Sequence, residues 1–229
     1  MLKKLGKLLA VSLLAAGMAA PAAASTLGDK AAALGAGQWT VLNKAGDGAG
    51  FDYNFIISCG DDCGDVILNY ADKGLWNPLT REMHFIGKGH YRELKHISYS
   101  EATNKWAREA NPYWTCGAPW SNCLGMGHGY EHTTINPATG DIFARVFNST
   151  EVYRWVRSTK TWSKLPAAPN PTIAIGLEYF PELGGVVLAG GGSAYLYKES
   201  TNSWSTLATG LSMGPYHNIA IYNPVHKIV

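Results

Sequence analysis

A pair of aromatic residues that returns three times constrains the fold of this chain more than any other feature. The first residue of each pair is Tyr or Trp, the second is Trp, and the two are seven positions apart. The pairs are Tyr99 and Trp106, Trp155 and Trp162, and Tyr197 and Trp204. The residues between the partners are polar and turn-forming, so each pair is expected to end one strand and begin the next strand of a β-hairpin.

A second marker runs in step with the aromatic pairs. Four turns carry a proline after Asn or Phe, at Asn77-Pro78, Asn136-Pro137, Phe180-Pro181 and Asn223-Pro224. The last three prolines are 44 and 43 residues apart, and Trp162 and Trp204 are 42 residues apart. A unit of this length with four short strands matches a β-propeller blade of ~40–50 residues. The first proline interval is 59 residues, and an insertion from Trp114 to Cys123 accounts for its excess.

The chain from residue 38 onward is therefore predicted to be all-β, as an incomplete β-propeller over 38–229. Short β-branched and aromatic runs recur between Gly, Pro, Asn and Ser clusters, without sustained helical periodicity. We expect three whole four-stranded blades at about 66–109, 128–166 and 172–208, and the start of another at 215–229. The stretch Gln38-Trp39-Thr40-Val41-Leu42 resembles the outer strands that begin at Thr161 and Ser203. The sequence is expected to be a fragment, since ring closure typically needs about 4–8 blades.

These features resemble the kelch family of β-propellers, including the kelch-like central domain of galactose-oxidase-type proteins. The resemblance covers roughly residues 75–229 and is carried by the aromatic pairs, the Asn-Pro turns and the Gly-rich strand end Gly190-Gly191-Gly192. The best unit runs from Gly184 to Leu207, whereas the preceding unit has Val146-Phe147-Asn148 in place of the double glycine. The resemblance implies a kelch-like propeller fold and does not by itself assign an activity.

Residues 1–24 are typical of a secretory signal peptide, and residues 25–37 are predicted to be a linker. Lys3, Lys4 and Lys7 precede a short apolar run from Leu8 to Ala20, and small residues follow this run. The run is shorter than the ~20 apolar residues that span a bilayer, so no integral membrane segment is expected after signal removal. The predicted location is secreted or periplasmic.

The four cysteines form two local pairs, Cys59 with Cys63 and Cys116 with Cys123. In an oxidising compartment, an even number of cysteines in Gly-rich loops favours disulfide bonds. Four cysteines allow three connectivities, and we favour the two local bridges because each closes a short loop of turn-forming residues. A four-thiolate zinc site is the alternative, but neither pair has the usual Cys-x2-Cys spacing. No metal or other cofactor is predicted.

A polar cluster before one expected inner strand supplies most of the candidate ligand-binding residues. Its members are His128, Tyr130, Glu131 and His132. In the fourth unit His217 corresponds to Tyr130, and Asn218 follows it. The kelch resemblance implies that these strand starts face the central channel on the side of the inter-blade loops. They would then either bind a polar small molecule or line a water-filled channel and hydrogen-bond to neighbouring blades.

Two tryptophans in the expected insertion, Trp114 and Trp120, are further candidates for ligand binding because they flank Cys116. Exposed aromatic residues on a disulfide-bonded loop suit stacking against sugar rings or contact with a protein partner. The alternative is that both pack over their own loop as a small apolar cluster. The insertion joins two blades and is expected on the same side as the strand starts.

Composition and charge exclude two further classes of protein, disordered chains and nucleic-acid-binding proteins. With 46% hydrophobic residues the chain can fill a core, so disorder throughout is excluded. The formal charge is +2, and removal of the signal lysines brings it close to zero, so no nucleic-acid partner is expected. The main prediction is an exported kelch-like binding module for a glycan, polymer or protein. The resemblance also allows a fragment of a secreted carbohydrate oxidase, and a structural surface-assembly protein is a third alternative.

Overall fold

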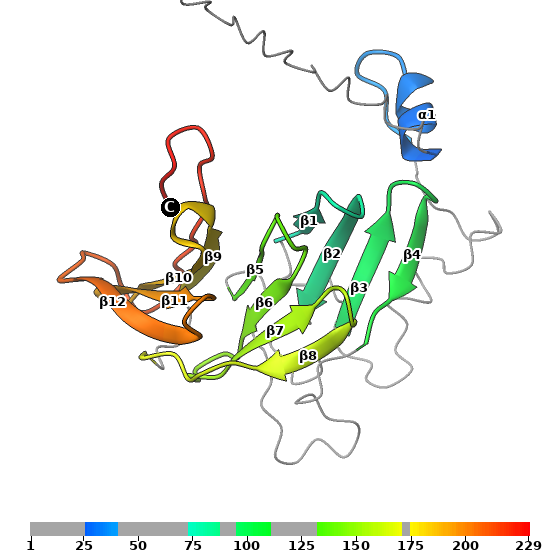
Figure 1. Ribbon diagram of the computed structural model, residues 1–229. Coiled ribbons are helices and arrows are strands. Elements are labelled where there is room, and N and C mark those ends of the chain that lie inside the picture. Colours follow the sequence, from blue (N-terminus) through cyan, green and yellow to red (C-terminus); the bar gives the residue numbers. More distant parts are fainter. Residues whose placement is uncertain (1–25, 41–72, 88–94, 111–131, 171–174) are drawn as a thin grey trace, which may run out of the picture.

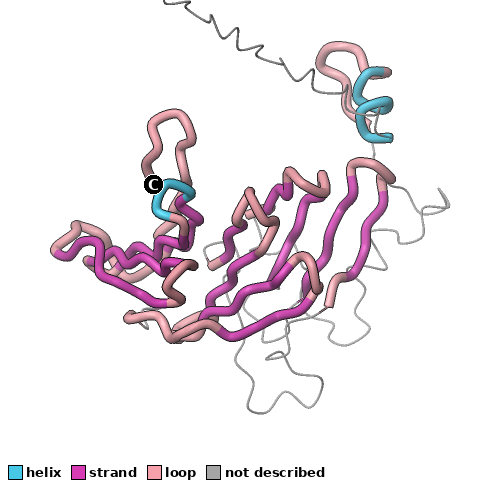
Figure 2. Tube along the Cα trace, in the orientation of Figure 1, coloured by secondary structure: helices cyan, strands magenta, loops and turns pink. Residues whose placement is uncertain are grey.

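The computed structural model describes residues 26–40, 73–87, 95–110, 132–170 and 175–229 (Figure 1). This part of the chain is nearly all β: it contains one short α-helix, one 3-10 helix and three four-stranded sheets (Figure 2). The helices are α1 (Thr26–Ala32) and η1 (Pro181–Leu183). The all-β prediction is confirmed for these residues. The helix α1 lies inside the stretch that was predicted to be a linker.

Each sheet is an antiparallel meander whose strands follow one another in chain order. Sheet 1 consists of β1 (Leu75–Asn77), β2 (Glu82–Gly87), β3 (Lys95–Ser100) and β4 (Lys105–Arg108). Sheet 2 consists of β5 (Thr133–Ile135), β6 (Ile142–Arg145), β7 (Val152–Val156) and β8 (Thr161–Lys164). Sheet 3 consists of β9 (Gly176–Phe180), β10 (Gly185–Gly190), β11 (Ser193–Lys198) and β12 (Ser203–Thr209). Sheets 1 and 2 fall within the first two predicted blades, and sheet 3 extends one residue beyond the third, to Thr209.

The first strands of the sheets lie side by side, as the inner strands of propeller blades do. The strand β5 contacts both β1 and β9, and the remaining strands of each sheet extend outward from this row (Figure 1). The row continues beyond β9, because a Cβ on Gly176 would lie 2.6 Å from the amide nitrogen of Ala220. The segment 219–222 therefore occupies the inner-strand position of a fourth unit. The described sheets do not close a ring.

The aromatic pairs are cross-strand neighbours in the third and fourth strands of each sheet. Tyr99 pairs with Trp106 in register, and the other two pairs are equivalent. The outer tryptophans also fasten one sheet to the preceding connection: the indole N–H of Trp162 donates to the carbonyl of Ala110 at 3.1 Å, and that of Trp204 donates to the carbonyl of Pro166 at 2.9 Å. The hairpin prediction from the seven-residue spacing is confirmed.

The Asn-Pro turns also share one geometry. The side-chain oxygen of each Asn accepts from the backbone N–H two residues later, at 3.0 Å for Asn77, 2.9 Å for Asn136 and 3.0 Å for Asn223. In all four turns the fourth residue after the Asn or Phe has a positive φ; these residues are Arg81, Gly140, Gly184 and Lys227. Because this left-handed conformation reverses the chain within a few residues, each turn brings the second strand back onto the first.

Two hydrophobic cores fill the spaces between consecutive sheets. Between sheets 1 and 2, Trp155 and Ile142 are buried together with Leu75 and Ile86. Between sheets 2 and 3, Phe143 is buried among apolar side chains of β9, β10 and β11. Each middle strand therefore contributes alternate residues to the two cores, as the period of two in a β-strand requires.

The predicted signal peptide, residues 1–24, lies outside the described residues. Within the described ranges, no helix is both long and apolar enough to cross a membrane.

Candidate functional site

Most of the predicted site lies outside the described residues. This applies to His128, Tyr130, Glu131, Trp114 and Trp120, which stay predictions. It also applies to the four cysteines, so the two local disulfides stay predictions as well. Among the candidates, the structure places His132, His217 and Asn218.

His132 is a fully buried residue at the start of the inner strand of sheet 2. Its Nε2 lies 3.2 Å from a guanidinium nitrogen of Arg145, and its ring lies 6.1 Å from that of Phe147. Arg145 is itself completely buried, and this burial lowers its pKa to about 10. His132 therefore packs inside the molecule rather than on an open surface.

His217 and Asn218 lie on the connection that follows sheet 3. His217 is exposed, has a φ of 55° and packs its ring 3.8 Å from that of Tyr216. The Asn218 side chain donates to the carbonyl of Gly214 at 2.6 Å and so holds this loop. The neighbours of these two residues differ from those of His132, so the described contacts do not join the three into one site.

Glu178 on β9 ties the inner strands of successive units together. Its carboxylate accepts from Lys73 at 2.7 Å, from the Thr134 hydroxyl at 3.2 Å and from the backbone N–H of Tyr222 at 3.3 Å. These partners belong to the segments at β1, β5 and the fourth unit. The charge of Glu178 is matched by Lys73, so the cluster acts as a structural joint.

Glu199 organises a second polar network, at the rim between sheets 2 and 3. It accepts from the Tyr179 hydroxyl at 2.8 Å and the Asn136 amide at 2.9 Å, and lies 3.3 Å from Arg154. Arg154 in turn pairs with Asp141 and lies 5.7 Å over the ring of Phe143. Burial, followed by the hydrogen bond to Glu199, raises the pKa of Tyr179, so this hydroxyl stays a donor.

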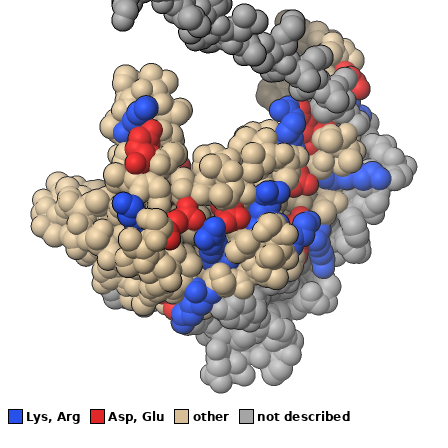
Figure 3. All heavy atoms as spheres, in the orientation of Figure 1, with Lys and Arg blue, Asp and Glu red and all other residues tan. Residues whose placement is uncertain are grey.

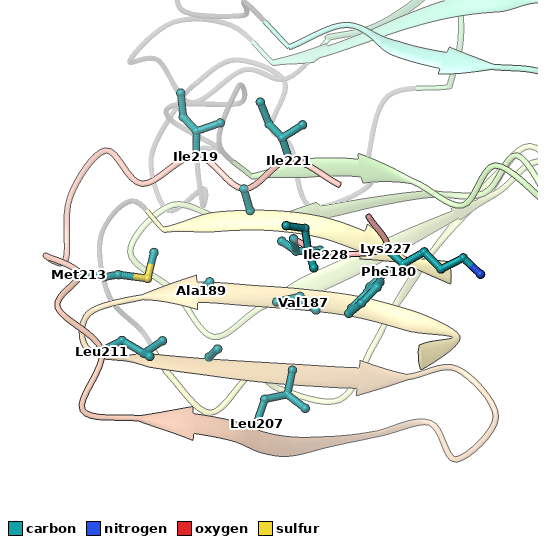
Figure 4. Close-up of a pocket in the computed structure, with 13 residues that line it drawn as sticks. Phe180, Val187, Ala189, Leu207, Leu211, Met213, Ile219, Ile221, Lys227 and Ile228 are labelled. Atoms are coloured by element: carbon teal, nitrogen blue, oxygen red, sulfur yellow. The ribbon is translucent and has the colours of Figure 1, made fainter. Parts of the chain in front are cut away.

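The face of sheet 3 that points away from sheet 2 forms an apolar groove of about 760 Å³. Its floor includes Val187, Ala189 and Leu207, and residues of the C-terminal segment form its wall (Figure 4). Ile221 and Ile228 of that wall are 71% and 57% exposed. Among the described residues that line the groove, Lys227 has the one charged side chain, so the groove is suited to an apolar occupant.

Strand register shows which residues of the other sheets are equivalent to this floor. Met83, Ile142 and Val186 each pair with the first aromatic residue of their sheet. The residues that follow them, His84, Phe143 and Val187, therefore occupy equivalent positions on equivalent faces. By the same register, His96, Val152 and Ala194 are equivalent.

In sheets 1 and 2 this face is covered by aromatic side chains of the next sheet. The ring of His84 lies 5.5 Å from that of Trp155, and the ring of Phe143 lies 6.3 Å from that of Tyr197. Val187 holds the third such position and lines the groove. The groove thus presents the surface that a strand pair carrying an aromatic residue covers elsewhere in the molecule.

The described residues hold no group of three or more His, Cys, Asp or Glu side chains that is placed to bind a metal ion. On the face seen in Figure 3, positive and negative side chains lie interspersed, and the region of sheet 3 is mostly uncharged. An uncharged region of this kind favours contacts that depend on apolar burial over those that depend on net charge.

No family model and no curated protein matches this chain. Among solved structures, it is similar to the crystal structure of TolB from Acinetobacter baumannii, with a TM-score of 0.43 and 13% sequence identity. The match covers 62% of this chain and 33% of the TolB chain, so the chain spans about a third of that protein's length. The fold described above rests on strand order and register.

Neither the groove nor a buried histidine pair, His84 and His96, is predicted from the sequence alone. Their alternation along two strands of one hairpin was visible, but their contact depends on the register of β2 on β3, which pairs Ile86 with His96. The groove combines residues from four strands and the C-terminal segment, so no local pattern could have revealed it.

Proposed function

We propose that this protein is an exported, kelch-like β-propeller protein that acts as a polypeptide-binding module. The kelch assignment is supported by the shared geometry of the aromatic pairs and of the Asn-Pro turns. Export is supported by the sequence of residues 1–24. The observation that carries the binding role is the groove on sheet 3, whose floor is equivalent to two faces that aromatic side chains cover.

The preferred occupant of the groove is a pair of β-strands with an aromatic side chain directed at Val187, supplied by a partner polypeptide or by another unit of the same propeller. The other two sheets show this arrangement, because Trp155 packs on His84 and Tyr197 packs on Phe143. A glycan suits the groove less well, because sugar rings stack on exposed aromatic faces and bind polar groups. The lining instead has many aliphatic residues, with Phe180 as its aromatic member. No contact among the described residues favours the carbohydrate oxidase alternative.

A peptide with the sequence of residues 193–208 is a suitable probe, because this hairpin carries Tyr197 and Trp204 and covers the equivalent face of sheet 2. Titration of the labelled peptide with the purified chain, followed by fluorescence anisotropy, should give saturable binding. The variant Val187→Asp places a charge on the groove floor and should weaken binding at least tenfold. A peptide with alanine at both aromatic positions should not bind.

Val225→Asp is the matched control, since Val225 is an 81% exposed apolar residue outside the groove lining. This variant should bind the peptide as the unmodified chain does. Equal binding by the Val187 and Val225 variants, or no binding by the unmodified chain, would contradict the proposal. Binding of a glycan array that survives Val187→Asp would instead place the ligand at another surface.

A further inference from the structure

A histidine pair is buried at the junction between sheets 1 and 2. Nδ1 of His84 lies 3.0 Å from Nε2 of His96, and both side chains are completely buried. Trp155 packs on both rings, at 5.5 Å from His84 and 4.9 Å from His96. Trp162 adds an edge contact 5.7 Å from His96. The two rings thus contribute to the contact between two sheets whose shared core is otherwise made of apolar and aromatic side chains.

Nothing in the repeat requires histidine at these positions. Phe143 and Val152 occupy them at the next junction, where both are completely buried or nearly so. Neither of those side chains can take up a proton. The histidines therefore give junction 1–2 a protonatable pair at positions that are apolar in junction 2–3.

The geometry fits a pair in which both rings are neutral. Each neutral imidazole carries one N–H, and a hydrogen bond between the rings needs one donor and one acceptor. If His96 donates through Nε2, the remaining proton of His84 is on its Nε2, which lies 3.8 Å from a carboxylate oxygen of Glu82. If both rings were protonated, each of the two facing nitrogens would carry a hydrogen, and the hydrogen bond between them would be lost.

The surroundings only partly stabilise the positive charge that an added proton would place on either ring. Among the described residues, Nε2 of His84 and Nδ1 of His96 have no hydrogen-bond partner. The charged groups that act on the pair are Glu82 on β2, Glu109 after β4 and Lys160 in the turn between β7 and β8. Burial has the largest effect: it lowers the pKa of His84, and it lowers that of His96 well below its ordinary value. Glu82 and Glu109 partly offset this effect at His84, whereas Lys160 opposes an added charge on both rings.

We propose that the His84–His96 pair makes the junction between sheets 1 and 2 an acid-sensitive joint, which opens under mildly acidic conditions while the junction between sheets 2 and 3 stays closed. Opening exposes both rings to water, where they accept protons, and each proton taken up favours the open form by about tenfold per pH unit. This inference is independent of the proposed peptide groove, which lies on sheet 3.

Amide hydrogen exchange on the full chain at pH 7.5, 6.5 and 5.5 tests the proposal, after correction for the intrinsic pH dependence of exchange. Protection in β2, β3 and β7 should fall as the pH is lowered, while protection in β10 and β11 is retained. The double variant His84→Phe, His96→Val gives junction 1–2 the residues of junction 2–3. Its protection in β2, β3 and β7 should not depend on pH in this range.

The control is the double variant His217→Gln, His226→Gln, which removes two exposed histidines and should respond to pH as the unmodified chain does. Uniform loss of protection in all three sheets, or an unchanged pH response after the His84 and His96 substitutions, would overturn the proposal. A second test needs only the unmodified chain: NMR titration should show that His84 and His96 take up protons only as protection is lost. Titration near the ordinary histidine pKa with full protection would also overturn it.

Discussion

The two junctions between consecutive sheets have the same geometry and different chemistry. At junction 2–3, Phe143 packs between Tyr179 and Tyr197, and the polar rim is joined through Glu199. At junction 1–2, the equivalent position is His84. The two histidines bond to each other, but Nε2 of His84, Nδ1 of His96 and Nε1 of Trp155 have no hydrogen-bond partner among the described residues. Since an unpaired buried polar atom costs free energy, we expect junction 1–2 to be the weaker of the two.

The largest effect is expected from truncating the equivalent residues. Phe143→Ala should lower the free energy of unfolding by about 3–5 kcal/mol, because it leaves a cavity in a closed core. His84→Ala at pH 7.5 should cost less, about 2 kcal/mol, because the imidazole ring is smaller and its Nε2 is unpaired, even though Nε2 of His96 loses its partner. Urea denaturation of both variants measures the difference. Equal losses of stability in the two variants would contradict the expected difference between the two junctions.

The second prediction concerns the polar rim of junction 2–3. Glu199→Ala should lower the free energy of unfolding by about 2–3 kcal/mol, since Tyr179, Asn136 and Arg154 lose a shared acceptor. A double-mutant cycle with Asn136→Ala should show coupling between the two residues. Strict additivity would mean that the rim does not act as a network.

The third prediction is the pH dependence of overall stability. The pKa values of His84 and His96 are lowered in the folded chain, so the unfolded chain binds more protons below the ordinary histidine pKa of about 6.5. The contribution of this pair to the free energy of unfolding is therefore fully present above about pH 6.5. It is lost as the pH falls from there toward the lower pKa values of the folded chain. The slope approaches about 1.4 kcal/mol per pH unit for each proton. Denaturation at several pH values should show this slope, and its absence would contradict neutral burial of the pair.

A smaller difference is expected between two equivalent turns. The side-chain amide of Asn136 donates to Glu199 at 2.9 Å, whereas that of Asn77 has no partner among the described residues. Asn136→Ala should therefore cost about 1 kcal/mol more than Asn77→Ala, although both remove the turn-forming oxygen. Thermal denaturation of the two variants resolves this difference. The reverse order would mean that turn geometry alone determines the cost.

The smallest effect is expected from Lys160→Gln. Its ion pair with Glu109 is 3.2 Å long, but the lysine side chain is 67% exposed, so the loss at pH 7.5 should stay below about 0.5 kcal/mol. Because Lys160 disfavours protonation of the histidine pair, the substitution should slightly reduce the acid sensitivity. A larger acid sensitivity in this variant would show that Lys160 acts in the opposite direction.

The sequence was sufficient to predict the sheets, because their markers are local. Tyr197 and Trp204 are joined by one short turn, so their spacing determines that they face each other. The Asn-Pro turns are equally local. The contact between His84 and His96, by contrast, depends on strand register, and the contact between Lys73 and Glu178 depends on the packing of inner strands 105 residues apart in the sequence. The groove depends on how sheet 3 and the C-terminal segment pack, which no repeat encodes.

The joint at Glu178 has a consequence for the order of folding. The hairpins of sheets 1 and 2 are short-range structures that can form as soon as they are synthesised. Glu178 comes later in the chain than Lys73 and Thr134, and the three make their contacts only after β9 has emerged. Such contacts between distant residues form slowly, because a long loop must close first. We therefore expect the inner row of strands to become rigid late in folding, once β9 has packed and Glu178 has bonded to Lys73 and Thr134.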